Sequence, residues 1–278
     1  NDAIINLSTK CHNLHTINID IESFPTLTSI SMIHLAQNNP KLSYVEMSPS
    51  LSSPSAVLAL ATCCPQLHTL LFHIDYLLPE SYCVIASNCI LLHTLTLRRA
   101  QLVPLVENGV RLPCETIEAG LTAMAKTLTN LRQLSIEGDS FGNFSSCLAS
   151  GQLSLTHLSV CLSDTTDKDV QILTAAFPSL RDLTLSNTHS LTDATVVAIT
   201  SNCHDIRRLD ISVCTKLLSL FVEGCPLIKH LYMHGDCESA ENLLTEEDLL
   251  VFPRYISVRA AQVYEGRKIF IGDEDARF

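Results

Sequence analysis

The chain has 278 residues and a formal net charge of −11 at pH 7, with 18 basic residues against 29 acidic ones. This balance argues against nucleic acid or an anionic membrane as the main partner, because both require a clustered basic surface. No apolar run approaches the roughly 18 residues that span a bilayer. The composition, 46% hydrophobic with 5% aromatic residues and no Trp, suits thin core layers of Leu, Ile, Val and Ala.

A phrase of nine residues recurs along the chain. Its form is Cys-x-x-Leu-x-x-Leu-x-Leu, with Ile or Phe at some apolar positions, and complete copies occupy 11–19, 64–72, 89–97 and 203–211. The first apolar position of each copy falls at Leu14, Leu42, Leu67, Leu92, Leu131, Leu155, Leu180, Ile206 and Ile228. By subtraction, the successive spacings are 28, 25, 25, 39, 24, 25, 26 and 22 residues. Units of roughly 20 to 29 residues, each a short strand and a returning helix, are typical of leucine-rich repeats.

Within each phrase the apolar residues alternate, which predicts a strand with one buried face. Between the phrases the period changes to that of a helix, and we expect helices at 27–39, 55–64, 118–128, 167–177 and 192–203. Thr192 or Asp193 is a natural N-cap for the last of them. Alternating strands and helices require a parallel sheet. We therefore predict an α/β leucine-rich-repeat solenoid, a horseshoe of about nine to ten repeats with its parallel sheet on the concave side and helices on the convex side.

Two segments depart from this period, although we expect one domain over 1–278. The spacing of 39 contains an insertion, 101–120, whose Pro and Gly residues predict an excursion from the rim, mainly over 101–114. The segment 251–278 carries a degenerate phrase in which Tyr255 and Val258 replace the anchor residues, and we predict a C-terminal cap.

The twelve cysteines follow the repeat. Five of them, Cys11, Cys64, Cys89, Cys203 and Cys225, head the phrase, where Leu and Phe replace Cys in other copies. This usage predicts a small buried hydrophobe and a reducing compartment, so we expect an intracellular protein of the cytoplasm or the nucleus. Because the chain begins at or just before a repeat and without Met, we expect it to be a fragment of a longer product.

Several of these features together resemble one class of repeat. They are the Cys that heads the phrase, the Pro after Cys64 and Cys225, the Leu-Thr-Asp helix start at 191–193, and Cys214 closing 209–214. Over roughly 11–236 they resemble the cysteine-containing leucine-rich repeats typical of F-box and leucine-rich-repeat proteins, the substrate receptors of cullin-RING ubiquitin ligases. The resemblance implies the substrate-binding domain of such a receptor.

The sequence departs from that family in two ways. No F-box precedes the repeats, and Cys is missing at Asn39, Leu128, Gln152 and Phe177. If an F-box was trimmed away, the ligase function stands and a ligase adaptor is a partner. If none existed, the repeats form a free-standing binding module.

Catalytic and cofactor motifs are not recognised in the sequence. Zinc sites require short paired spacings of Cys and His, and a phosphate-binding loop requires several glycines followed by Lys; neither pattern occurs, nor does Gly-x-Ser-x-Gly. We therefore expect neither an enzyme, nor a metal site, nor a cofactor.

Three columns of side chains are predicted on the concave face. The first is Thr16, Tyr44, Thr69, Thr94, Gln133, His157, Asp182, Arg208 and His230; the second is Asn18, Glu46, Leu71, Thr96, Ser135, Ser159, Thr184, Asp210 and Tyr232; the third is Asp20, Ser48, His73, Arg98, Glu137, Cys161, Ser186, Ser212 and His234. Binding energy concentrates in aromatic residues and Arg at desolvated spots.

The candidate binding residues are chosen from these columns. They form one group at the C-terminal end and one at the N-terminal end: Arg208, Asp210, His230, Tyr232 and His234, and Tyr44, Leu71, His73 and Arg98. The columns hold only two arginines, which disfavours a polyanionic small ligand, so we expect a protein or peptide partner. The position just before several strands carries a basic or imidazole side chain: His15, His68, His93, Arg132, Arg181, Arg207 and Lys229. These residues form either a modestly positive edge or ordinary solvent-exposed positions where the strands begin.

Two other classes of function stay open. A scaffold or inhibitor of the ribonuclease-inhibitor type would favour repeats of 28 to 29 residues, and only the first spacing, 28, agrees. A regulator of a small GTPase would use an arginine near the insertion, Arg98, Arg99 or Arg111. Spacings of 24 to 26 favour the ligase receptor.

Overall fold

The computed structural model describes residues 2–19, 28–48, 51–73, 79–99, 114–138, 141–186, 188 and 190–211. It also gives the backbone of three later strands, 230–234, 257–261 and 270–271, and only the backbone of 79–80 and 114–116. The chain divides into two compact units, Asn1–Ser154 and Leu155–Phe278, which we call the N-terminal and the C-terminal unit.

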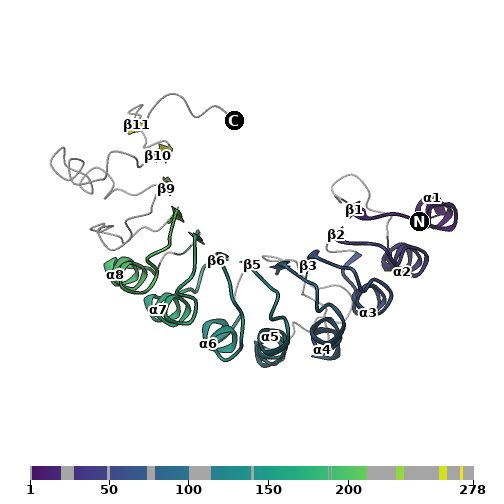
Figure 1. Ribbon diagram of the computed structural model, residues 1–278, viewed down its shortest axis with the longest axis horizontal. Helices are drawn as coiled ribbons and strands as arrows, with labels where there is room; N and C mark the ends of the chain where they lie inside the picture. The colour runs from purple at the N-terminus through teal and green to yellow at the C-terminus, as the bar shows by residue number, and fades with distance from the viewer. Residues whose placement is uncertain are drawn as a thin grey trace. The chain divides into compact units, whose positions relative to one another are not determined.

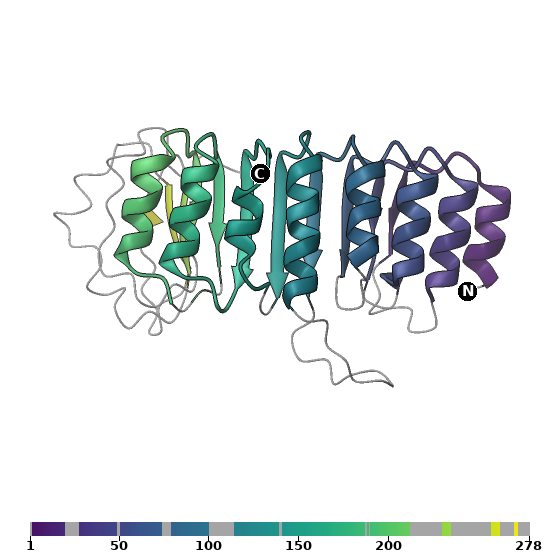
Figure 2. The ribbon, with the colours of Figure 1, turned by 90° about the horizontal axis from the view of Figure 1, so that it is seen from below.

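The N-terminal unit alternates helices and strands. Its elements are α1 (Asp2–Lys10), β1 (Thr16–Asn18), α2 (Ser29–Asn38), β2 (Tyr44–Glu46), α3 (Pro54–Cys63), β3 (Thr69–His73), α4 (Pro79–Asn88), β4 (Thr94–Arg98), α5 (Cys114–Thr127), β5 (Gln133–Gly138) and α6 (Phe144–Ala149). Strands β1 to β5 pair in chain order and are all parallel. Helices α1 to α6 lie side by side against one face of these strands (Figures 1 and 2). We call the other face, which none of these helices covers, the open face.

The C-terminal unit repeats the same alternation as far as β8 (Arg208–Asp210), beyond which the structure describes only strands. Its elements are β6 (His157–Leu162), α7 (Asp167–Ala176), β7 (Asp182–Leu185), α8 (Asp193–Asn202), β8 (Arg208–Asp210), β9 (His230–His234), β10 (Ser257–Ala261) and β11 (Phe270–Ile271). Strands β6 to β10 are parallel in chain order, and β11 runs antiparallel to β10. Both units therefore consist of stacked strand-helix repeats. This confirms the predicted α/β solenoid of leucine-rich repeats.

The alternating residues of each strand explain the stacking. In β3, Leu70 and Phe72 are fully buried toward the helices, while Leu71 on the open face is half-buried. Leu95 and Leu134 occupy the place of Leu70 in the next two strands. Full burial of such a side chain contributes about 1.5–3 kcal/mol, but each layer is covered only by its neighbours, so the repeats depend on one another.

The Cys that heads the phrase packs against the end of the helix of the previous repeat. The Cys64 thiol is fully buried and lies 3.7 Å from the carbonyl oxygens of Ala36 and Asn39, at the end of α2. The Cys203 thiol contacts the carbonyl oxygens of Thr174 and Phe177 at 3.6 Å. The last carbonyls of a helix have no partner within it, so a weak thiol donor suits this place. The prediction of a small buried residue is confirmed at these two cysteines and at Cys89.

Burial also fixes the protonation of these thiols. It raises the pKa of Cys64 to about 12, with smaller contributions from Cys63 and Cys89, and it raises the pKa of Cys89 to about 12. Both therefore remain thiols at neutral pH. Cys11, at the same repeat position, is only partly buried.

Acidic side chains connect consecutive helices in both units. In the C-terminal unit the Asp167 carboxylate accepts hydrogen bonds from the Thr192 backbone N–H at 2.8 Å, the Thr192 hydroxyl at 2.7 Å and the Thr195 hydroxyl at 2.6 Å. In the N-terminal unit Glu118 accepts from the Asn143 backbone N–H at 2.8 Å. Thr192 and Asn143 each precede a helix as its N-cap, so one helix helps to start the next.

The structure differs from the sequence-based prediction at three helices and at the insertion. Helices α1, α4 and α6 were not predicted, and α5 begins at Cys114, so the last seven residues of the predicted insertion, 114–120, are helical. A Cβ on Gly120 would lie 2.3 Å from the Tyr82 ring, so α5 packs against α4 too closely for a side chain here. The remaining insertion residues, 101–113, and most of the predicted cap lie outside the described residues.

The lengths of the described helices show whether any of them could span a membrane. Among the described residues the longest helix, α5, has 14 residues, and none is long and apolar enough to cross a membrane.

Candidate binding surface

The strand pairs reproduce the predicted columns of the open face. In the N-terminal unit Tyr44 pairs with Thr69, and Glu46 with Leu71. Further along, His73 pairs with Arg98, which pairs in turn with Glu137. In the C-terminal unit the columns run through β6, β7, β8 and β9 in the predicted register. Within each unit the first two columns are thus confirmed as neighbours, and in the third column His73, Arg98 and Glu137 are. Asp20 and Ser212 of the third column lie outside the described residues, and the role of all three columns in binding stays a prediction.

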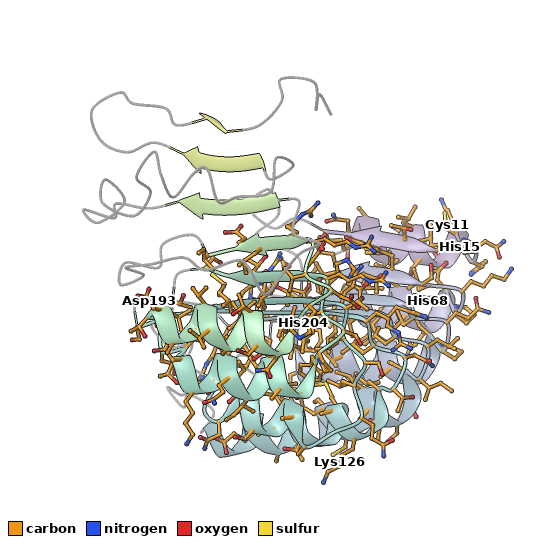
Figure 3. All side chains as sticks on the ribbon, turned by 60° about the vertical axis from the view of Figure 1, so that its left-hand side comes forward. Cys11, His15, His68, Lys126, Asp193 and His204 are labelled. Atoms are coloured by element: carbon orange, nitrogen blue, oxygen red, sulfur yellow. The ribbon has the colours of Figure 1, made fainter. Side chains whose placement is uncertain are left out.

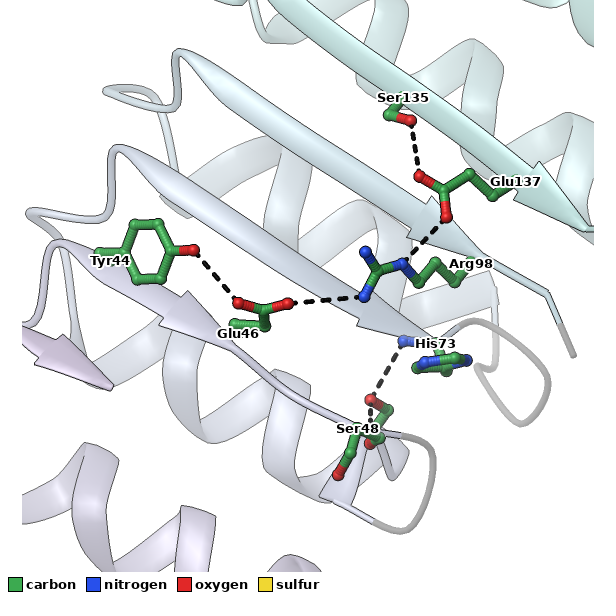
Figure 4. A network of polar contacts seen from close by, with 8 residues as sticks. Tyr44, Glu46, Ser48, His73, Arg98, Ser135 and Glu137 are labelled. Atoms are coloured by element: carbon green, nitrogen blue, oxygen red, sulfur yellow. Dashed lines mark hydrogen bonds and ion pairs between the residues drawn. The ribbon is translucent and has the colours of Figure 1, made fainter. Parts of the chain in front are cut away.

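Arg98 organises the open face of the N-terminal unit (Figure 4). Its Nε donates to Glu137 Oε2 on the adjacent strand β5 at 3.1 Å. Its Nη1 lies 3.5 Å from Glu46 Oε1 on β2, so the guanidinium reaches across β3. The three residues, which we call the N-terminal cluster, connect strands β2 to β5. Each ion pair is partly exposed and contributes about 0.2–1 kcal/mol at most, so its value lies in holding a fixed geometry.

Hydroxyl groups hold both carboxylates of this cluster. The Tyr44 hydroxyl donates to Glu46 Oε2 at 3.2 Å, and the Ser135 hydroxyl donates to Glu137 Oε1 at 3.0 Å. Burial raises the pKa of Tyr44, and the charge of Glu46 and the hydrogen bond to it raise it further, against an opposing effect of Arg98. Tyr44 therefore stays protonated as a donor. With two carboxylates and one guanidinium, the cluster carries one excess negative charge.

The end of β3 is anchored to the loop after β2. The His73 backbone N–H donates to Ser52 Oγ at 3.1 Å, and the Ser52 hydroxyl donates to the Ser48 carbonyl at 2.8 Å (Figure 4). Leu71 on β3, which pairs with Glu46 on β2 and Thr96 on β4, is a half-buried apolar side chain. The surface thus offers fixed polar groups around one apolar side chain, which suits a peptide or a protein loop.

In the C-terminal unit we call the strand face that α7 and α8 do not cover its open face (Figure 1), and one acidic and two basic side chains meet there. Asp182 Oδ2 on β7 lies 3.4 Å from His157 Nε2 on β6 and 3.8 Å from Arg208 Nη1 on β8. Thr156 Oγ1 lies 2.9 Å from the other ring nitrogen, Nδ1 of His157. We call His157, Asp182 and Arg208 the C-terminal cluster. One carboxylate here serves two basic side chains.

The predicted site residues fall into two places. Tyr44, Leu71, His73 and Arg98 come together on β2, β3 and β4 of the N-terminal unit. Arg208 and Asp210 lie on β8, and the backbones of His230 and Tyr232 pair with them. His234 ends β9, and the side chains of its three predicted residues lie outside the described part of the structure.

Sequence reasoning left four charged residues out of the candidate list. Glu46, Glu137, His157 and Asp182 were in the predicted columns, but the choice favoured aromatic side chains and Arg. The signal was present, because Glu137 stands beside Arg98 and Asp182 beside Arg208 in adjacent strands. A long Arg side chain reaches that far.

The described residues offer polar and charged groups and no candidate metal site. In the ranges from 2 to 211 that the structure describes, no three His, Cys, Asp or Glu side chains could share a metal ion. The open faces provide hydrogen-bond donors, carboxylates and guanidinium groups in fixed positions.

Comparisons with known proteins give a likeness in fold only. No family model matches the sequence, and no curated protein matches it. Among solved structures, a chain in the "Crystal structure of Rad7 and Elc1 complex in yeast" aligns over 92% of this chain and 83% of its own length. The identity is 12% and the TM-score is 0.41.

Proposed function

We propose that this chain is a protein-recognition domain that binds a protein or peptide partner on the open faces of its strands. The observation that carries the proposal is the N-terminal cluster. Its Arg98 is held by two carboxylates, which are themselves held by Tyr44 and Ser135, on a face that no described helix covers. Groups that are already ordered lose little conformational entropy on binding, which favours affinity.

The more specific role that we propose is the substrate-binding domain of an F-box-type ubiquitin ligase receptor, without catalytic activity of its own. Support comes from the cysteine-headed repeat and from its use as a buried helix-end residue at Cys64 and Cys203. A ligase adaptor would be a partner only through an F-box elsewhere in the product. Buried thiols with a pKa near 12, as at Cys64 and Cys89, suit the intracellular compartment that we propose.

The alternative is a free-standing scaffold or inhibitor that uses the same surface. The GTPase-regulator version of this alternative is less favoured, because a catalytic arginine must be available to the partner's nucleotide. Arg99 is 6% exposed, and Arg98 is held between two carboxylates. Arg111 lies outside the described residues.

The test is a pull-down from cells with the tagged full-length gene product, analysed by mass spectrometry. Recovery of a cullin and its adaptor supports the ligase receptor, and a different stoichiometric partner supports the free-standing module. In parallel, the double variant Glu46→Ala/Glu137→Ala and the single variant Arg208→Ala are compared with Lys168→Ala, an exposed residue of α7.

Binding on the open faces requires that the partner is lost with one of the first two variants and retained with the third. A partner that survives both open-face variants, while the proteins remain folded by circular dichroism, contradicts the proposed surface.

A further inference from the structure

The edge of the N-terminal unit where helices end and strands begin differs in charge from the rest of the chain. Its turns, 11–15, 39–43, 64–68, 89–93, 128–132 and 150–154, contain no Asp or Glu, although the whole chain has a net charge of −11. The basic and imidazole side chains of these turns are His12, His15, Lys41, His68, His93 and Arg132. Lys10 and Lys126 stand in the last turns of α1 and α5 at the same edge.

Five residues of this edge form a continuous column just before the strands. Backbone N–H groups of Ser43, His68, His93 and Arg132 each donate to the carbonyl of the previous member, beginning with His15, at 2.8–2.9 Å. Neighbouring strands lie about 4.8 Å apart, so the column is roughly 19 Å long. The rings of His68 and His93 are stacked, with centroids 5.5 Å apart and an interplanar angle of 19°. His15 and His68 are labelled on the same side of this unit in Figure 3.

An exposed apolar pair adjoins the stacked rings. Ile90 is 57% exposed and Leu91 is 38% exposed, whereas the matching turn positions hold Pro or polar residues at 40–41, 65–66 and 129–130. The turn is fixed, because Asn130 donates to the Ile90 carbonyl at 2.9 Å and a His93 ring nitrogen lies 2.6 Å from the Leu91 carbonyl oxygen. A positive strip with a fixed apolar anchor is thus presented to solvent.

The helix dipoles explain only part of this arrangement. Carbonyl groups at helix ends attract cations, which accounts for Lys10 and Lys126 in last turns. The dipoles do not explain two adjacent imidazoles that repel each other once both are protonated, nor an exposed Ile-Leu pair.

The groups around the stacked rings favour an anionic partner. His15 and Arg132 lie along the column, and Lys41 lies on an adjacent turn, so apart from the thiols of Cys11, Cys64 and Cys89 every ionisable side chain on these turns is basic. Imidazole ordinarily takes up its proton near pH 6.5. An anionic partner would favour that uptake, and by linkage the uptake would favour the partner.

We propose that this edge, which we call the histidine edge, is a second docking surface that binds an acidic protein segment carrying an apolar side chain for Ile90 and Leu91. Charge complementarity defines this occupant, and a column of roughly 19 Å matches about six extended residues at 3.3 Å each. The surface is separate from the open faces of the proposed function. Its affinity rises as the pH falls from 7.5 to 6.0.

The test uses a fluorescein-labelled peptide of eight residues, six Glu and two Leu, in an anisotropy titration of the whole chain. A peptide with Gln in place of Glu is the charge control. We expect at least threefold tighter binding at pH 6.0 than at pH 7.5, little binding of the Gln peptide, and weakening at high salt. The peptide carboxylates stay ionised at both pH values.

Three variants locate the binding. His68→Gln/His93→Gln should abolish the pH dependence, and Ile90→Ser/Leu91→Ser should weaken binding at both pH values. Lys168→Gln, on α7 and outside both proposed surfaces, should leave the titration unchanged. Circular dichroism checks the fold of each variant.

Three results would overturn the proposal. They are absence of binding at pH 6.0, binding that the His68→Gln/His93→Gln protein retains in full, and equal binding of the Gln peptide. Self-association at pH 6.0 in light scattering, relieved by the same double variant, would make a second copy of the chain the occupant and would also overturn it. None of these results depends on the pull-down that tests the open faces.

Discussion

The two clusters on the open faces lie at different positions of the repeat and differ in their balance of acidic and basic groups. In the N-terminal cluster one guanidinium, Arg98, serves the two carboxylates of Glu46 and Glu137. In the C-terminal cluster one carboxylate, Asp182, serves an imidazole and a guanidinium. The excess negative charge of the N-terminal cluster suits a partner with basic groups. In the C-terminal cluster the charges of Asp182 and Arg208 cancel, and the cluster is positive only when His157 is protonated.

The clusters also differ in rigidity. The side chain of Arg98 is 35% exposed and makes contacts at 3.1 and 3.5 Å with residues on two other strands. The side chain of Arg208 is 51% exposed and lies 3.8 Å from Asp182. We therefore expect changes in the N-terminal cluster and its framework to affect folding stability, and changes in the C-terminal cluster to affect mainly binding.

The largest effect should come from Gly138→Ala, at the end of β5 beside Glu137. Gly138 has a φ of +128°, and a Cβ there would lie 2.1 Å from the Arg99 carbonyl oxygen. Strain and displacement together should lower the free energy of unfolding by about 2–4 kcal/mol. Urea unfolding monitored by circular dichroism measures this change.

A matched control on the same strand is Ser135→Ala. It removes the hydrogen bond to Glu137 without straining the backbone, and should cost about 0.5–1 kcal/mol. If Gly138→Ala costs no more than this control, the end of β5 does not hold the N-terminal cluster in place.

Asp167→Asn should have the next largest effect and weakens the framework of the C-terminal unit. The substitution removes the charged acceptor of three hydrogen bonds from Thr192 and Thr195. Allowing for the solvent exposure of Asp167, we expect a loss of about 1–2 kcal/mol. Lys168→Gln, on the next residue of the same helix, should change stability by less than about 0.5 kcal/mol.

The pH dependence of this effect has a definite sign. Burial alone would raise the pKa of Asp167, but hydrogen bonds from Thr192 and Thr195 outweigh it and hold the pKa below its ordinary value of 3.8. The contribution of Asp167 is therefore present above pH 4 and is lost as the pH falls through the lower folded-state pKa. Unfolding at pH 6 and at pH 3 should show the difference between wild type and Asp167→Asn shrinking at the lower pH. A constant difference would exclude the carboxylate charge as its source.

The regular part of the fold could be predicted because the repeat constrains it twice. The alternation of Leu70 and Phe72 requires one strand face to be buried, and the spacing of about 25 residues sets which residues of adjacent strands pair. The register of the columns follows from these two constraints alone. Helix α6 was missed because its six residues are too few to show helical periodicity.

The missed features depend on contacts between side chains and backbone that no period encodes. The start of α5 was not predicted because glycine is common in loops, so Gly120 was assigned to the insertion. In the structure Gly120 lies within the helix, where the nearby Tyr82 ring leaves no room for a side chain. The contact from Arg98 to Glu46 crosses an intervening strand, so neither sequence neighbours nor paired strands indicate it. The side chains of His230, Tyr232 and His234 lie outside the described residues, and their role stays a prediction.

Arg98→Glu should have a smaller effect on stability than the two framework changes. It would place three carboxylates within one cluster and should lower the free energy of unfolding by about 1 kcal/mol at low salt. Arg98→Met, which removes the charge and keeps most of the apolar stem, should cost about half as much. Because the Debye length falls from about 10 Å at 0.1 M salt to 3 Å at 1 M, added NaCl should recover part of the loss for Glu but not for Met.

Arg208→Glu is the corresponding reversal in the C-terminal cluster and should have the smallest effect on stability, below about 0.5 kcal/mol. The new carboxylate would face Asp182, but both groups are partly exposed and the original contact is long, at 3.8 Å. A cost equal to that of Arg98→Glu in the same urea series would remove the distinction between the two clusters. A small cost makes Arg208 the better probe of recognition, because a loss of partner affinity in a protein of unchanged stability can then be assigned to the missing contact itself.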